Sequence, residues 1–215
     1  IFFPVEKFRE KTSLTFFSRF TSIAIGPGMG IDEETKQFTL NTLKNISNSN
    51  LTTQKIILDA DALNQISFEK EWWNKIPNKC ILTPHFGEMS RLTKISIQEI
   101  QKNKVEITQE FSSKWNQIIV LKGSNTIISH PNGRLLISPW ANSGLAKAGS
   151  GDLLTGIISG LSAHSHLNSF ESASLGVYLH GLSGNLATNC KGVYGMTSTN
   201  ILEKIPEAFR KIQLN

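Results

Sequence analysis

A short run of small residues, Gly149-Ser150-Gly151-Asp152, has the residue types that phosphate chemistry needs. It precedes an apolar series, Leu153 to Leu161, whose helical spacing predicts a buried helix that begins at about Asp152. A glycine loop at a helix start leaves backbone N–H groups without intrahelical partners, backed by the positive end of the helix dipole. Such a start binds anions, among them phosphate groups. The carboxylate of Asp152 could take a proton from a hydroxyl that attacks a phosphoryl group.

The same four residues also fit a purely structural role. Ser150 or Asp152 can cap a core helix while the glycines make a turn, as happens at many helix starts. The motif alone does not separate the two interpretations, so the rest of the chain has to decide.

Four further motifs each follow a short apolar run that is typical of a buried parallel strand. They are Gly26-Pro27-Gly28-Met29-Gly30, Asp59-Ala60-Asp61, Thr83-Pro84-His85 and Lys122-Gly123-Ser124. In a parallel sheet the carboxyl ends of the strands meet at one edge, and ligands bind there. We therefore expect these motifs and Asp152 to converge on one site.

The polar residues of these motifs suggest individual roles. Asp59 and Asp61 are predicted to face the same crevice, where they would hold a hydrated magnesium ion or a ligand hydroxyl, unless one caps the next helix. His85 would contact a ligand at the same rim, and Lys122 would reach a nucleotide phosphate. A phosphate cradle, a base and a pocket together favour phosphoryl transfer.

The elements that must position these residues alternate between strand and helix along the chain. This alternation predicts a three-layer α/β/α sandwich around a mostly parallel sheet, with residues 1–215 forming a single domain. Residues 97–115 are predicted to form the longest helix, and a last helix from Thr197 is expected to break at Pro206.

Composition narrows the class of protein. The net charge of +5 comes from scattered Lys and Arg, and no nucleic-acid-binding pattern is present. No apolar run approaches the roughly 20 residues of a membrane span. Cys80 and Cys190 lack metal-ligand spacing, which favours reduced thiols and a cytoplasmic protein. The chain opens at Ile1, so an upstream portion is expected to be missing.

The full set of motifs resembles the ADP/ATP-dependent NAD(P)H-hydrate dehydratases of the ribokinase-like superfamily, from about Gly26 to the C-terminus. Gly-Ser-Gly-Asp is shared across that superfamily. Asp59-Ala60-Asp61-Ala62-Leu63 and Thr83-Pro84-His85-Phe86-Gly87-Glu88 are more particular to the dehydratases. The chain departs from the family at Ser143 and Phe86, where relatives usually have proline, and it lacks an earlier strand and glycine-rich loop.

This resemblance implies a repair reaction on the S epimer of hydrated NADH or NADPH. The damaged ring hydroxyl is phosphorylated with ADP or ATP, with Mg²⁺ on the phosphates, and phosphate is then eliminated. The resemblance also implies small-molecule partners and a homo-oligomer, while the composition predicts no nucleic-acid and no membrane partner. Two other hypotheses stay open: another ribokinase-like kinase acting on a vitamin precursor, and a truncated, non-catalytic nucleotide-binding module.

The resemblance also assigns residues, with no dedicated metal ligands. Asp152 is implied as the catalytic base. The substrate-binding residues implied are Gly28, Asp61, His85, Asn142 and Asp152. The nucleotide-binding residues implied are Lys122, Gly123, Ser124, Asn125, Thr126, Gly149, Ser150 and Gly151.

Overall fold

A six-stranded sheet forms the centre of the protein, in a computed structural model that describes residues 17–48, 54–164 and 166–213. The strands lie in chain order: β1 (Ser22–Ile25), β2 (Lys55–Leu58), β3 (Ile81–Leu82), β4 (Ile118–Leu121), β5 (Ile127–Ser129) and β6 (Leu135–Ile137). Strands β1 to β4 are parallel, while β5 and β6 add an antiparallel meander. The prediction of a mostly parallel sheet is therefore confirmed.

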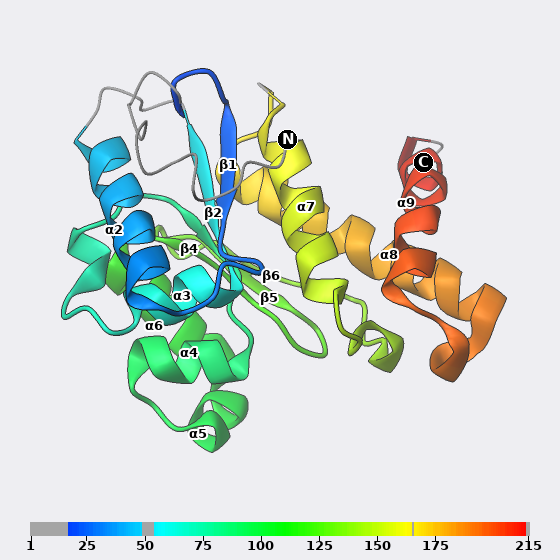
Figure 1. The fold of residues 1–215 in the computed structure, drawn as a ribbon. Helices are drawn as coiled ribbons and strands as arrows, with labels where there is room; N and C mark the ends of the chain where they lie inside the picture. The colour runs from blue at the N-terminus through cyan, green and yellow to red at the C-terminus, as the bar shows by residue number, and fades with distance from the viewer. Residues whose placement is uncertain (1–16, 49–53, 165, 214–215) are drawn as a thin grey trace.

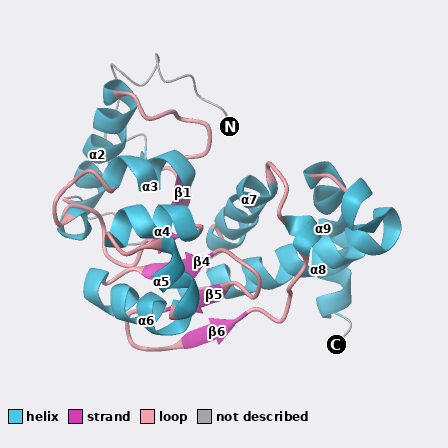
Figure 2. Cartoon of the chain, turned by 90° about the horizontal axis from the view of Figure 1, so that it is seen from below, coloured by secondary structure: helices cyan, strands magenta, loops and turns pink. Residues whose placement is uncertain are grey.

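Helices cover both faces of this sheet (Figures 1 and 2). One layer holds α2 (Glu33–Ser47), α3 (Ala60–Ile66), α4 (Phe86–Thr93), α5 (Ile97–Lys102) and α6 (Lys104–Trp115). The other holds α7 (Ser150–Ser162) and α8 (Ser169–Gly195), with α9 (Ser198–Gln213) packed on α8. The predicted three-layer α/β/α arrangement is the observed one.

Alternating strand residues supply the two cores. Ile56, Leu58 and Leu82 pack with the α2–α6 layer, while Ile57 and Ile81 pack with the α7–α8 layer. Successive side chains of a strand point to opposite faces, so a strand covered on both sides must be apolar throughout. This explains why the strands appear in the sequence as unbroken apolar runs.

Three helix predictions were wrong in detail. The stretch 97–115 is two helices, because Asn103 leaves the helical region at φ −120° and ψ 41°. The longest helix is instead α8, which carries a kink at Gly192. Pro206 lies inside α9 and does not end it. The helix after Gly149 begins at Ser150, two residues before the expected Asp152.

The turn after β1 depends on a close backbone approach. Gly26 has φ +130°, and a Cβ placed on it would lie 1.8 Å from the carbonyl oxygen of Asp59. No side chain fits there without separating the ends of β1 and β2.

Among the described residues, no helix is long and apolar enough to cross a membrane.

Gly26→Ala should therefore destabilise the protein by more than about 3 kcal/mol, because the β1 and β2 ends must move apart. Gly28→Ala is the matched control: Gly28 also has positive φ, at +70°, but an added Cβ meets no atom within 4 Å. Its cost should be the left-handed strain alone, about 1–2 kcal/mol. Urea unfolding of both variants measures the difference, and equal losses would contradict the close-approach explanation.

Candidate functional site

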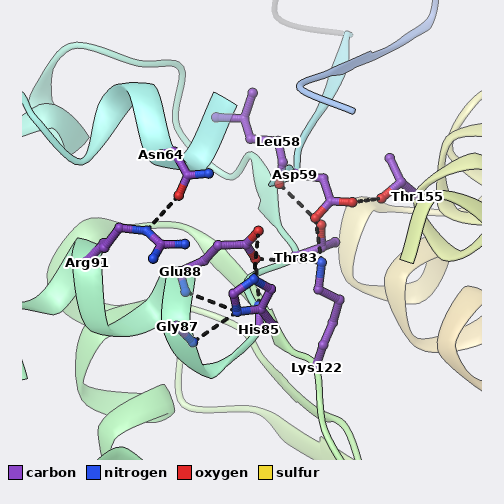
Figure 3. Close-up of polar contacts among 10 residues, drawn as sticks. All are labelled: Leu58, Asp59, Asn64, Thr83, His85, Gly87, Glu88, Arg91, Lys122 and Thr155. Carbon is purple, nitrogen blue, oxygen red and sulfur yellow. Dashed lines mark hydrogen bonds and ion pairs between the residues drawn. The ribbon is translucent and has the colours of Figure 1, made fainter. Parts of the chain in front are cut away.

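The carboxyl ends of the parallel strands meet at one edge, as expected for this kind of sheet (Figure 3). Lys122 after β4 donates its backbone N–H to the carbonyl of Pro84 after β3, at 2.8 Å. His85 and Lys122 thereby form a parallel bridge that extends the sheet beyond β3 and β4. This pairing places the imidazole and the ammonium group at the same edge.

Asp59 is the most buried charged residue of this edge, with 1% of its surface exposed. Its Oδ1 lies 2.6 Å from the Lys122 ammonium, and its Oδ2 accepts a 2.6 Å hydrogen bond from the Thr155 hydroxyl of α7. One carboxylate thus connects the ends of β2 and β4 to the second turn of α7 (Figure 3).

Asp61 and Asp59 have different partners, and a shared crevice for the two stays a prediction. The Oδ2 of Asp61 accepts a 2.8 Å hydrogen bond from the backbone N–H of Gly30 and so holds the glycine turn after β1. The helix α3 begins at Ala60, between the two acids. The alternation of a strand, in which residues two apart face the same side, therefore does not extend to Asp61. Asp59 occupies the N-cap position of α3 but makes no side-chain cap bond.

His85 caps α4, and it also lines the cavity described below. Its Nδ1 accepts hydrogen bonds from the N–H groups of Gly87 (2.9 Å) and Glu88 (3.2 Å), while Glu88 Oε2 accepts from the His85 N–H at 2.7 Å. Burial lowers the pKa of His85, and the nearby Glu88 opposes that effect. With Nδ1 accepting, the neutral ring carries its proton on Nε2, on a side chain that is 53% exposed.

Lys122 lies between two carboxylates and the start of α7. Besides Asp59, it approaches Glu88 Oε2 at 3.7 Å. A Cβ on Gly151 would lie 3.6 Å from its ammonium nitrogen, so the first turn of α7 passes directly beside this charge. The predicted meeting of Lys122 with the Gly-Ser-Gly-Asp loop is thus present in the structure.

The start of α7 offers backbone donors, though not all those expected. Gly149 adopts the left-handed conformation at the N-cap, and the Ser150 N–H donates to the carbonyl of Lys147 at 3.2 Å. Within the described chain, this leaves the amides of Gly149, Gly151 and Asp152 without an intramolecular acceptor. The Asp152 side chain is exposed in the first turn.

The Ser150 side chain points to α8. Its hydroxyl lies 3.0 Å from Nε2 of His180, and both residues are buried. Burial lowers the pKa of His180 to about 4, so its ring is neutral near neutral pH. Sequence reasoning assigned His180 no role; its only signal there was a lone imidazole within an apolar, glycine-rich helix.

A cavity of about 580 Å³ lies beside these groups, a size typical of small-molecule sites. It is lined by the turn after β4, the segment 138–147, the start of α7 and the middle of α8. Of the residues singled out in the sequence, the lining includes His85, Lys122, Gly123, Ser124, Thr126, Asn142, Ser150 and Gly151. It does not include Gly28, Asp61, Asn125, Gly149 or Asp152.

Asn125 and Asn142 hold the wall of the cavity in place. Asn125 donates its side-chain amide to the carbonyl of Ser138 at 3.0 Å. Asn142 accepts from the Gly144 N–H at 2.8 Å and donates to Asn185 and Thr188 of α8, at 2.8 and 2.9 Å. Trp140, also on this wall, was not singled out in the sequence.

No group of three or more His, Cys, Asp or Glu side chains suited to a metal occurs in the described ranges. Both oxygens of Asp59 are already hydrogen-bonded or paired, and one oxygen of Asp61 is occupied by Gly30. Asp59 and Asp61 therefore have few free oxygens for a divalent cation.

Lys122→Met should destabilise the protein by about 3–5 kcal/mol, because it leaves the buried Asp59 carboxylate without its cation. The double variant Asp59→Asn/Lys122→Met removes both charges and keeps an oxygen that can accept from Thr155. We expect it to recover at least half of the loss in urea unfolding. A double variant as unstable as Lys122→Met would show that the pairing does not hold the strand ends.

The sequence model of the NAD(P)H-hydrate dehydratase family matches residues 3–207. The bifunctional NAD(P)H-hydrate repair enzyme Nnr of Thermofilum pendens is 35% identical over 191 residues, which are 89% of this chain and 35% of that enzyme. The chain thus spans about a third of that relative's length.

Two solved structures share the fold. The ADP/ATP-dependent NAD(P)H-hydrate dehydratase of Bacillus subtilis, co-crystallised with ATP/Mg²⁺ and soaked with CoA, superposes with a TM-score of 0.76 at 31% identity over 89% of this chain and 66% of that one. A ribokinase-like superfamily protein of Enterococcus faecalis gives 0.76 at 29% identity, over 92% and 65%. The fold is therefore ribokinase-like, and the chain belongs to the NAD(P)H-hydrate dehydratase family.

Proposed function

We propose that the protein restores NADH or NADPH from the S epimer of its hydrated form, in a dehydration that consumes ADP or ATP. The observation that carries the proposal is the start of α7: Ser150 and Gly151 line the 580 Å³ cavity, Gly151 lies beside the Lys122 ammonium, and the next residue, Asp152, is an exposed carboxylate. Membership of the dehydratase family supports the choice of substrate.

The first chemical step is phosphoryl transfer to the ring hydroxyl. Asp152 takes the hydroxyl proton, the hydroxyl oxygen bonds to the terminal phosphorus, and the bond from that phosphorus to its bridging oxygen breaks, leaving AMP from ADP or ADP from ATP. In the second step the ring C–O bond breaks, phosphate leaves, and a proton is lost from the neighbouring carbon. The carbon–carbon double bond of the dihydropyridine is then restored.

The start of α7 stabilises the transferred group electrostatically. The amides of Gly149 and Gly151 and the hydroxyl of Ser150 are the donors we assign to the phosphate. Lys122 adds a positive charge beside Gly151. The turn residues Gly123, Ser124 and Thr126 line the same cavity and are assigned to the nucleotide, with Asn125 supporting the wall.

The hydrated dinucleotide is assigned to His85 and Asn142, which line that cavity, and to Gly28 and Asp61, which lie outside its lining. Gly28 and Asp61 belong to the turn after β1, which Asp61 fixes through Gly30. His85, at the cap of α4, is half-exposed and has its Nε2 3.3 Å from Glu88 Oε1. Asn142, whose amide is held by α8, is the fourth residue assigned to this substrate.

We propose that Mg²⁺ enters on the nucleotide. Magnesium in nucleotide sites is commonly held by phosphates, water and only one or two carboxylates. This mode of binding is compatible with this edge of the sheet, because most oxygens of Asp59 and Asp61 already have partners. The B. subtilis relative crystallised with ATP/Mg²⁺ supports a nucleotide with its metal as co-substrate. We further expect a cytoplasmic homo-oligomer whose partners are small molecules.

The test is recovery of the reduced-nicotinamide absorbance from purified hydrated NADPH with Mg²⁺ and either ADP or ATP. Recovery should require the nucleotide, and Asp152→Asn should lower its rate by roughly 10²–10⁴-fold, as expected for loss of a general base. Glu33→Gln is the matched control, since Glu33 is also an exposed carboxylate in the first turn of a helix. It should leave the rate unchanged.

Recovery that persists in Asp152→Asn would contradict the assigned base. No recovery from the unaltered chain with either nucleotide would contradict the proposed activity.

A further inference from the structure

His180 forms part of the cavity wall, and the reaction proposed above gives it no task. It lies near the middle of α8 with 8% of its surface exposed, and its neutral ring contacts the start of α7 at the cavity wall. A buried imidazole must satisfy one donor and one acceptor, so its position among apolar residues needs a specific partner.

That partner is Ser150, the first residue of α7. The imidazole Nε2 lies 3.0 Å from the Ser150 Oγ, and Ser150 is 3% exposed. The Trp140 indole packs on the next residue of α8, since a Cβ on Gly181 would lie 2.2 Å from it. The contact between Ser150 and His180 thus lies where α7, α8 and the segment that carries Trp140 meet.

The Ser150 hydroxyl is important as a hydrogen-bond donor because the backbone N–H of Ser150 already has an acceptor. That N–H donates to the carbonyl of Lys147 at 3.2 Å. If Ser150 contributes a donor to a phosphate group beside α7, that donor must be its hydroxyl.

A neutral imidazole can meet a hydroxyl in two ways. If Nε2 accepts, the Ser150 hydrogen points at His180 and only oxygen lone pairs face the cavity. If Nε2 carries the proton and donates, the Ser150 hydrogen is free to point into the cavity. Phosphate oxygens are acceptors, so only the second arrangement lets Ser150 bind them.

We propose that His180 is a positioning residue which donates from Nε2 to Ser150 Oγ and so directs the Ser150 hydroxyl hydrogen to a phosphate of the bound nucleotide. The inference deepens the proposed function, and it rests on that proposal only in placing the nucleotide in this cavity.

The first test is calorimetric binding of ADP and of adenosine, with Mg²⁺ and without hydrated substrate. His180→Leu should weaken ADP binding on the order of tenfold, the value of one hydrogen bond to a charged group, and leave adenosine binding unchanged. His180→Gln should restore most of the ADP affinity, because the glutamine side-chain amide can donate a hydrogen bond at a similar distance from the backbone. Equal losses for ADP and adenosine would mean a merely structural role and would overturn the proposal.

A double-mutant cycle then asks whether His180 acts through Ser150. In a Ser150→Ala background, His180→Leu should change the ADP dissociation constant by less than about twofold. Additive losses would overturn the proposal. Thermal melting of each variant checks that it is folded.

A measurement on the unaltered chain covers the case in which His180→Leu does not fold. The ¹⁵N shifts of the His180 ring in the ADP complex should report a proton on Nε2; a proton on Nδ1 alone would overturn the proposal.

The two proposals can fail separately. Binding of ADP that depends on His180, without recovery of reduced nicotinamide, would contradict the proposed activity and support this inference. No binding of either ADP or ATP by the unaltered chain would overturn both.

Discussion

The ion pair between Asp59 and Lys122 holds together the elements on which the site depends. Lys122 follows β4, Asp59 follows β2, and the second oxygen of Asp59 is held by Thr155 of α7. The Asp59 side chain is 1% exposed, and a carboxylate buried in this way without a partner is strongly unfavourable. The elements β2, β4 and α7 are therefore constrained to meet. The same contact sets the charge at the site, because it holds the Lys122 ammonium beside Gly151, where the backbone amides of α7 begin. The Asp59–Lys122 ion pair therefore determines both the placement of these elements and the positive charge at the site.

From this contact the site extends to the cavity, whose walls are fixed by polar contacts to α8: Asn142 with Asn185 and Thr188, and Ser150 with His180. The exposed Asp152 and the glycine turn held by Asp61 lie outside the lining of that cavity. This arrangement suits the transfer of a phosphoryl group between two ligands, because catalysis of that reaction rests on positioning and on neutralising charge.

The sequence was sufficient for the sheet and for the meeting of its strand ends. Apolar runs followed by polar motifs predicted both, since parallel strands share one carboxyl edge. It could not predict the partners of Asp59, because Lys122 is 63 positions away and burial of a charge is not readable from residue type. The break at Asn103 and the continuation of α9 through Pro206 were also missed, since local propensity is weak against tertiary packing. The Ser150–His180 contact depends on where α8 crosses the start of α7, which no spacing in the sequence reveals.

The central claim is that phosphorylation at this site is transient and ends in elimination. The most direct measurement is ³¹P NMR of the protein with hydrated NADPH, Mg²⁺ and ADP. We predict that inorganic phosphate and AMP appear in equal amounts, in step with NADPH, with no stable phosphorylated dinucleotide. A phosphorylated product that accumulates would contradict the account and identify a kinase. Nucleotide that is bound but never consumed would contradict it as well, and would identify a binding module.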